Sequence, residues 1–379
     1  MRVGSDLAGT GRLMAGLEDA ARRALCDVVD EGIFAAGGLA AVFVHGGLAI
    51  DVAVGETANG RPLRSDDLHN VYCLVKPLPY LLLAHVLEGA GVGPDDQLEG
   101  AISLPRWCPG GLTLRILASH QANLVEPSAM LWRMTPRVRR AELLEQSAID
   151  RTTSGTGAEG GVVGYSELVG GLLCEAVIQQ LKGCPAGPYC SEAMLGPLGL
   201  SDDVVVDAAS ALAAGERVQA PVSGLPVSRL PMLSEILPIH LGEIRLALGA
   251  LATMRGAAGL MAAVGQVMAG VSQPGLPSPS LLRDLLHDDR PLVFDPVLQR
   301  PAKWAGGLMT DLNQQHISQI AGAGAVGHAG GLANSVALYD PARDASVAVY
   351  LNGVGSGFYD QALPRQQVVD EILDAAPTT

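Results

Sequence analysis

Apolar and polar residues follow two different periods along this 379-residue chain. Residues 12–32 place apolar positions at helical spacing, which predicts an amphipathic helix. The segment "GLAAVFVHGGLAIDVAVGE", which starts at Gly38, predicts a β-hairpin that turns at His45-Gly46-Gly47. Strand-like text returns only late in the chain, in "WAGGLMTDL", "GAVGHAGG", "ANSVALYD" and "ASVAVYLNG", and a last helix follows in "FYDQALPRQQVVDEILDA". The predicted sheet is therefore divided between the two ends of the sequence.

The middle of the chain reads as helical and is punctuated by Gly and Pro. Its better helix candidates are "GLTLRILASHQ", "RRAELLEQSAI" and "SELVGGLLCEAVIQQLKG". The order of these elements predicts an α/β (α+β) fold, with an antiparallel sheet of about five strands, flanking terminal helices and an inserted, mainly helical domain. We expect the sheet domain to comprise residues 1–75 and 240–379, and the inserted domain residues 76–239.

Composition narrows the class of partner. Hydrophobic residues make up 48% and charged residues 17%, values typical of a folded globular protein. A net charge of −14 without a basic cluster argues against a nucleic-acid partner.

The N-terminus lacks the apolar core of a signal peptide, and the most apolar stretch is interrupted by Arg255 and Gln266, so we expect a cytoplasmic protein without a membrane segment. The six cysteines are expected to be reduced thiols, and neither a metal nor another cofactor is expected. Oligomeric state is not indicated.

The segment "HNVYCLVKPLPYLLLAHVLEGAG" places Cys73 at the predicted start of an apolar helix, with Lys76 one turn later. Unpaired backbone N–H groups and a nearby cation both stabilise a thiolate. A cysteine in this setting can be a nucleophile for acyl transfer. The alternative is a small buried cysteine that precedes a lysine by chance.

Two later motifs favour the chemical interpretation. They read Tyr165-Ser166-Glu167 and His328-Ala329-Gly330. With Cys73-Leu74-Val75-Lys76, the chain resembles the penicillin-recognising serine enzymes, especially the branch of class C β-lactamases, DD-peptidases, esterases and transacylases. That family carries S-x-x-K, then Y-x-N, then K-T-G or H-x-G. The resemblance extends over about residues 35–375 and implies the β-lactamase/transpeptidase-like fold.

The resemblance also implies roles for individual residues. Cys73 would attack an acyl carbonyl, while Lys76 and Tyr165 would move the proton. His328 would line the opposite wall, on the strand next to the nucleophile. The Gly330-Gly331 segment would approach closely, and the N–H groups of Cys73 and Gly331 would form an oxyanion hole. The alternatives are that Tyr165 is a core tyrosine and that His328 is only packed within its strand.

The chain departs from the family pattern at two positions. Cysteine replaces the nucleophilic serine, and Glu167 replaces the asparagine of the middle motif. A carboxylate that reaches Lys76 would keep the lysine charged and so favour a Cys73 thiolate. Glu167 could otherwise be an exposed helix residue.

A thioester intermediate favours transfer to amines over hydrolysis, and it exchanges readily with a thioester donor. We therefore expect a cytoplasmic acyltransferase, active in biosynthesis, that takes a small-molecule acyl substrate and passes it to an amine or hydroxyl acceptor. An acyl carrier or coenzyme A is a candidate carrier of the acyl group. The alternatives are an esterase or thioesterase, and a non-catalytic binding homologue. β-Lactam defence is not expected, and neither the G-x-S-x-G nor the H-E-x-x-H motif occurs.

Overall fold

The hairpin expected around His45 forms one edge of a large antiparallel sheet. Strands β1 (Ala35–Val44) and β2 (Gly47–Gly55) are joined by a two-residue turn. His45 and Gly46 have φ angles of 51° and 74°. A tight turn with two positive φ values matches the twist of the strands that it connects, so the local sequence specifies this hairpin.

The structure is a computed structural model. It describes residues 6–31, 35–122, 124, 139, 142–143, 164–166, 168–219, 222–223, 244–247, 249–287, 292–330, 334–354 and 358–378. The helix candidate "RRAELLEQSAI" lies mostly outside these residues.

The late strands complete the sheet and join the two ends of the chain. They are β10 (Trp304–Ala305), β11 (Leu308–Met309), β12 (Val326–Ala329), β13 (Ser335–Asp340) and β14 (Ala345–Val354). The strand order is β10-β11-β12-β13-β14-β1-β2, and the short β6 (Val222–Ser223) pairs with β14 in parallel. The expected antiparallel sheet is confirmed, with more strands than the five expected because the short β10, β11 and β6 extend it.

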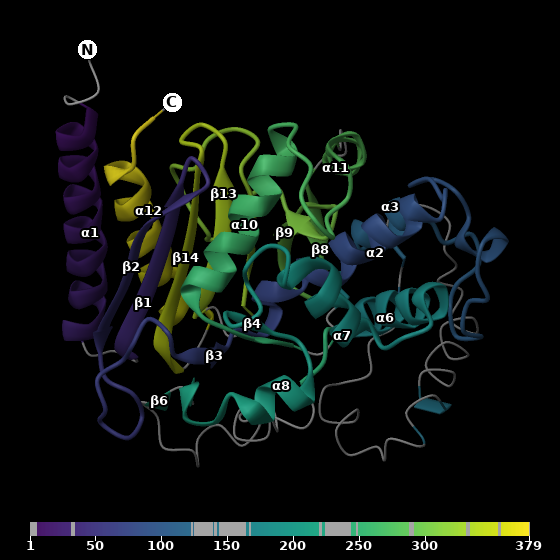
Figure 1. Cartoon of the computed structure of the whole chain (residues 1–379), viewed down its shortest axis with the longest axis horizontal. Helices are drawn as coiled ribbons and strands as arrows, with labels where there is room; N and C mark the ends of the chain where they lie inside the picture. Colours follow the sequence, from purple (N-terminus) through teal and green to yellow (C-terminus); the bar gives the residue numbers. More distant parts are fainter. Residues whose placement is uncertain are drawn as a thin grey trace.

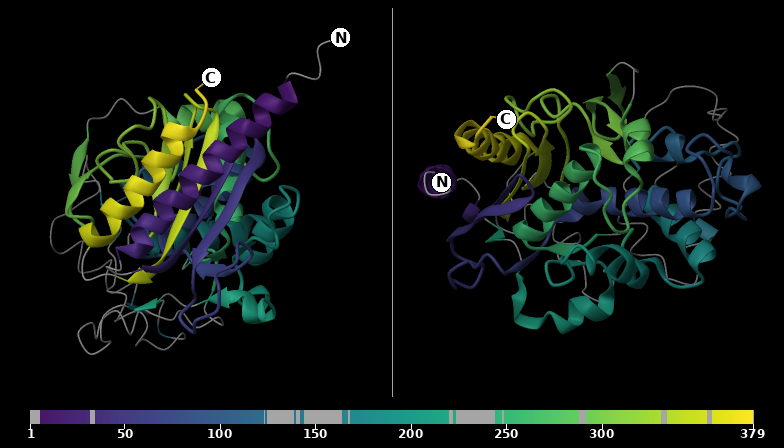
Figure 2. Two further views of the ribbon diagram at one scale, coloured as in Figure 1. Left: turned by 90° about the vertical axis from the view of Figure 1, so that its left-hand side faces the viewer. Right: turned by 45° about the horizontal axis from the view of Figure 1, so that its top comes forward.

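Helices cover both faces of the sheet. Helices α1 (Asp6–Asp30) and α12 (Phe358–Ala375) pack side by side on one face, and α10 (Met254–Met268) packs on the other (Figures 1 and 2). Alternate residues of β1 face the two cores: Leu39 and Ala41 pack with α10, whereas Ala40 and Val42 pack with the terminal helices. This period of two is what a strand buried on both faces requires.

The remaining elements extend the molecule on the α10 side (Figure 1). The longer helices are α2 (Pro77–Gly89), α6 (Val169–Lys182) and α11 (Pro279–Leu286). Shorter ones are α3 (Leu114–Ala118), α7 (Ala186–Cys190), α8 (Ala208–Ala213), η1 (Tyr72–Val75), η2 (Leu98–Gly100), η4 (Ser191–Leu195) and η5 (Gly215–Arg217). A small sheet has the order β4 (Val204–Val205), β7 (Leu251–Ala252), β3 (Leu68–Asn70), β5 (Val218–Gln219), and β8 (Val293–Asp295) pairs with β9 (Arg300–Ala302).

Within the described ranges, no helix combines the length and the apolarity needed to cross a membrane. The apolar stretch around Arg255 divides instead into strand β7 and the buried helix α10. The expected domain boundaries at residues 76 and 239 stay a prediction.

Candidate active site

Cys73 lies in a short 3₁₀ turn rather than in the first turn of the apolar helix. Helix α2 begins at Pro77, whose fixed φ suits a first helical position and whose missing N–H is no loss there. Lys76 is the residue just before this helix, and its N–H donates to the carbonyl of Cys73 over 2.9 Å. Both side chains are buried. The sequence prediction placed the helix start four residues too early, but it correctly placed the cysteine one turn before the lysine.

The backbone is strained next to the nucleophile candidate. Tyr72 has a left-handed φ of 49°, and its N–H donates to Asn70 Oδ1 over 3.0 Å. His120, which contacts the same site, also has a left-handed φ of 54°. A non-glycine residue in this region costs about 1 kcal/mol, so the surrounding structure must hold each of these residues in place.

Strand β12 forms the wall opposite Cys73, and Ser335 of β13 connects this strand to the turn that carries Cys73 by hydrogen bonds. The Ser335 hydroxyl donates to the carbonyl of Val71 over 3.3 Å, and the Gly330 N–H donates to the Ser335 carbonyl over 2.9 Å. A Cβ on Gly330 would overlap the Ser335 hydroxyl and lie 2.9 Å from the Val71 carbonyl oxygen. Glycine at position 330 therefore allows the strand to approach the turn that carries Cys73.

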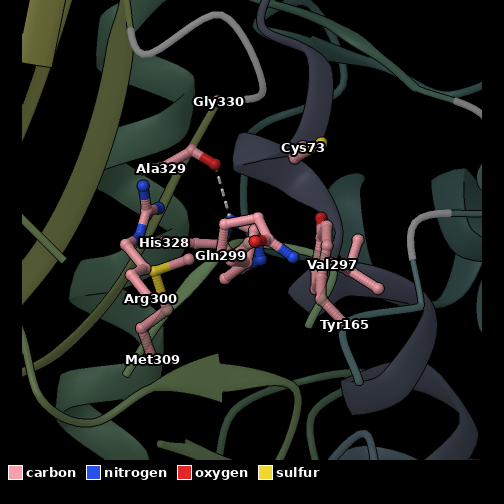
Figure 3. Close-up of a pocket in the computed structure, with 10 residues that line it drawn as sticks. Cys73, Tyr165, Val297, Gln299, Arg300, Met309, His328, Ala329 and Gly330 are labelled. Atoms are coloured by element: carbon pink, nitrogen blue, oxygen red, sulfur yellow. Dashed lines mark hydrogen bonds between the residues drawn. The ribbon is translucent and has the colours of Figure 1, made fainter. Parts of the chain in front are cut away.

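A cavity of about 360 Å³ lies between this strand and the turn that carries Cys73. The candidate residues Cys73, Tyr165, His328 and Gly330 all line it (Figure 3). Its other walls are formed by the loop after β8, the start of β9 and strand β11: Val297, Leu298, Gln299, Arg300 and Met309. Residues that lie far apart in the sequence thus meet at one concave site of a size typical for small ligands.

Tyr165 is held by its backbone and by its ring. Its N–H donates to Asp295 Oδ2 over 2.9 Å, and the next N–H, that of Ser166, donates to His120 Nδ1 over 3.1 Å. The ring stacks on Trp304, with centroids 4.9 Å apart and planes at 13°. The Lys76 Nζ lies 5.8 Å from the centroid of the tyrosine ring. These contacts fix the phenol beside the lysine and above the cavity.

Two histidines near the lysine are neutral. Burial lowers the pKa of His328 to about 3, and the Lys76 ammonium adds to the shift. Burial also lowers the pKa of His120 well below its usual value, with smaller contributions from His328 and Lys76. The Ser166 N–H can only donate, so His120 Nδ1 accepts and the ring proton is on Nε2. Lys76 thus contributes to the lowered pKa of both rings.

Two of the other cysteines, Cys174 and Cys190, are fully buried and do not line the cavity. All six cysteines are free, and burial raises the pKa of Cys190 to about 12 and that of Cys174 further still. Within the described ranges, no cluster of three or more His, Cys, Asp and Glu side chains could hold a metal ion.

Two predicted site residues, Glu167 and Gly331, lie outside the described residues, so their expected roles stay predictions. Three residues that shape the site were not predicted. His120 lies in the helix candidate "GLTLRILASHQ", Ser335 lies in a predicted strand, and Asp295 precedes a proline in a turn. Only the Asp-Pro pair carried a local signal, and that signal indicated a turn rather than a contact with Tyr165.

Comparison with known structures gives the same architecture. A penicillin-binding protein homologue from Caulobacter crescentus superposes with a TM-score of 0.71 at 19% identity, over 96% of this chain and 97% of that chain. A family VIII carboxylesterase gives 0.71 at 17% identity, over 94% and 97%. EstCE1, described as a hydrolase with promiscuous acyltransferase activity, gives 0.66 at 16% identity, over 94% and 99%. At these identities the likeness establishes the fold.

No curated protein sequence matches the chain. The Beta-lactamase family model, however, matches residues 26–370, which include all three motifs and the sheet strands from both ends of the chain. This match confirms the resemblance identified from Cys73, Tyr165 and His328. The chain belongs to the Beta-lactamase family.

Proposed function

We propose that the protein is an acyltransferase that forms a covalent thioester on Cys73 and passes the acyl group to an amine or hydroxyl acceptor. The observation that carries this proposal is the meeting of Cys73, Tyr165, His328 and Gly330 around one cavity, with the Lys76 amine beside the tyrosine ring. The fold supports it, because the similar structures include esterases and a hydrolase with acyltransferase activity.

The chemistry divides into two balanced steps. In the first, the Cys73 sulfur forms a bond to the acyl carbonyl, the thiol proton moves to the leaving group through Lys76 and Tyr165, and the donor's alcohol or thiol departs. In the second, the acceptor attacks the thioester, its proton follows the reverse route, and the Cys73 thiol is restored. A buried lysine beside a fixed phenol is suited to this proton transfer, because neither group must move far.

The direct test is intact-mass spectrometry of the protein after incubation with a panel of acyl thioesters and p-nitrophenyl esters. We expect one acyl group per chain, located on Cys73 by peptide mapping. Cys73→Ala should lose the adduct and on the order of 10³-fold or more in turnover. Cys26→Ala, which removes a thiol on α1, is the matched control and should keep both. An adduct that survives Cys73→Ala would refute the proposal, and a chain that never acylates would be a binding homologue.

Transfer is distinguished from hydrolysis by product partition. With one p-nitrophenyl ester and increasing amine, the wild type should form more amide and less free acid. Cys73→Ser keeps the cavity but passes through an oxoester, which reacts less readily with amines relative to water, so its amide fraction should fall. Free acid alone at every amine concentration would identify an esterase or thioesterase.

A further inference from the structure

We infer that His328 is a fixed hydrogen-bond acceptor in the cavity, and that it selects a substrate presenting a neutral O–H or N–H group rather than a carboxylate at this point. The inference rests on the proposed function, because it concerns the substrate of the same cavity. It goes beyond that proposal by naming the chemical class of the group that lies against β12.

The first step is the tautomer of the ring. His328 Nδ1 lies 2.9 Å from the carbonyl oxygen of Ala329, a contact that Figure 3 shows as a dashed line. A carbonyl oxygen can only accept, so Nδ1 must carry a hydrogen. A neutral imidazole has only one such hydrogen, and Nε2 is then left with a lone pair.

The second step is that the ring is neutral in its buried setting. Burial is the largest cause that lowers its pKa to about 3, and the Lys76 ammonium acts in the same direction. Near neutral pH the ring is therefore uncharged, and a charged ring is not available to pair with an anion. A carboxylate against Nε2 would need that charged ring, whereas a hydroxyl or amide N–H would need only the lone pair.

The third step is that this lone pair has no hydrogen-bond partner among the described residues. The His328 side chain is 1% exposed, and Nε2 is a buried atom without a donor. A buried acceptor that is left unpaired destabilises the fold, so folded proteins rarely keep one without a use. His328 and Cys73 line the same cavity, so the donor that we assign to Nε2 is a group of the bound substrate.

The aromatic neighbours keep the ring in this orientation. The ring centroid lies 5.4 Å from that of Trp304 and 6.0 Å from that of Tyr165, with tilted planes. Rotation of the ring would break the Nδ1 hydrogen bond to Ala329 and disturb both contacts. The lone pair is therefore preorganised, which reduces the cost of forming a hydrogen bond to a substrate.

Binding to the inactive Cys73→Ala variant tests the inference without any covalent chemistry. Dissociation constants are measured by NMR titration for butyramide, for its 2-, 3- and 4-hydroxy derivatives, and for succinamate. One of the hydroxy derivatives should bind about tenfold more tightly than butyramide, which corresponds to one hydrogen bond of about 1.4 kcal/mol, and succinamate should bind more weakly. In Cys73→Ala/His328→Phe the hydroxyl preference should disappear, and in Cys73→Ala/His328→Gln, whose amide oxygen can accept, part of it should return.

A second experiment tests whether the hydrogen-bond donor to His328 belongs to the amine that accepts the acyl group. Wild-type product partition is compared between 2-aminoethanol and propylamine, which differ by a hydroxyl in place of a methyl group. If His328→Phe removes a preference for 2-aminoethanol, the hydrogen-bond donor belongs to the amine. If a hydroxyl preference is seen only in the binding experiment, the hydrogen-bond donor belongs to the acyl group.

No hydroxyl preference in either experiment would overturn the inference, as would a preference that His328→Phe retains or tighter binding of succinamate. If the preference is seen but Cys73 never acylates, the inference stands and the proposed function fails.

Discussion

Replacing Asp295 should separate the positioning of Tyr165 from the general stability of the fold. The Asp295 carboxylate is fully buried and accepts three backbone N–H groups. Oδ2 accepts from Tyr165 over 2.9 Å, and Oδ1 accepts from Val297 over 2.8 Å and from Leu298 over 3.0 Å. One side chain therefore ties the motif that carries the phenol to the loop that forms a wall of the cavity.

The size of the effect follows from these contacts. Asp295→Ala leaves the buried N–H of Tyr165 and the partly buried N–H groups of Val297 and Leu298 without an acceptor. At about 1 kcal/mol each, the loss in the free energy of unfolding reaches about 3 kcal/mol. For a chain of 379 residues, with an unfolding entropy of about 2.1 cal/mol/K per residue, that corresponds to a fall in Tm of about 4 °C. A displacement of Tyr165 by about 1 Å should lower kcat by up to about 10²-fold, and the loosened cavity wall should raise KM.

Asp295→Asn separates the role of the carboxylate in holding Tyr165 from its role in holding the turn at Val297 and Leu298. An asparagine gains more by directing its oxygen at the two turn donors, Val297 and Leu298, and its NH₂ group then faces the N–H of Tyr165. We expect this variant to keep most of the stability and the KM of the wild type but to lose at least tenfold in kcat.

Asp340→Ala is the matched control. Asp340 is equally buried and accepts from the N–H groups of Gly322 and Ala342 and from Arg343, but it does not line the cavity. Thermal unfolding and ester turnover are measured for all variants below the Tm of the least stable one. If Asp295→Ala and Asp340→Ala lose similar stability and both keep wild-type kcat, Asp295 does not position Tyr165 and the reasoning fails.

Three further outcomes are expected. Gly330→Ala should cost at least tenfold in turnover, because its Cβ meets the Ser335 hydroxyl, while Gly16→Ala, with no atom within 4 Å, should be neutral; equal activities would show that the strand can retreat. Burial lowers the pKa of His69 to about 4, so between pH 6.5 and pH 4 the unfolded chain binds a proton that the folded chain does not, and stability should fall as the pH drops. In His69→Leu, the slope of the free energy of unfolding against pH, measured by chemical denaturation, should be shallower by about 1.4 kcal/mol per pH unit. An unchanged slope would contradict this. Glu167→Gln should slow alkylation of Cys73 near neutral pH if the glutamate holds Lys76 charged, and an unchanged pH profile of alkylation would show that it does not.

Much of the architecture could be predicted because it depends on short-range pattern. The alternation of apolar residues in β1 and the tight turn at His45 specify the first hairpin, and the terminal helices follow from helical spacing. Several short elements were missed, since strands of two residues such as β4 and β7 are too short to show a period. The start of α2 was also misplaced, although Pro77 gave a local signal for it.

The sequence by itself determined the family of the protein and the candidate residues of its site. Cys73, Lys76, Tyr165 and His328 could be recognised because the motifs have a fixed order and fixed residue types. Three of these residues line one cavity, and Lys76 lies beside Tyr165.

Only the tertiary structure decided how those residues are held. Asp295 reaches Tyr165 across 130 positions, His120 reaches Ser166 across 46, and Ser335 reaches Val71 across 264. Periodicity reports which face of an element is apolar, but it does not report which distant N–H or carbonyl a buried polar side chain will meet. Each buried polar group must find its partner in the packed interior. The hydrogen bonds that hold Tyr165 and the turn that carries Cys73 therefore form only when the elements are assembled.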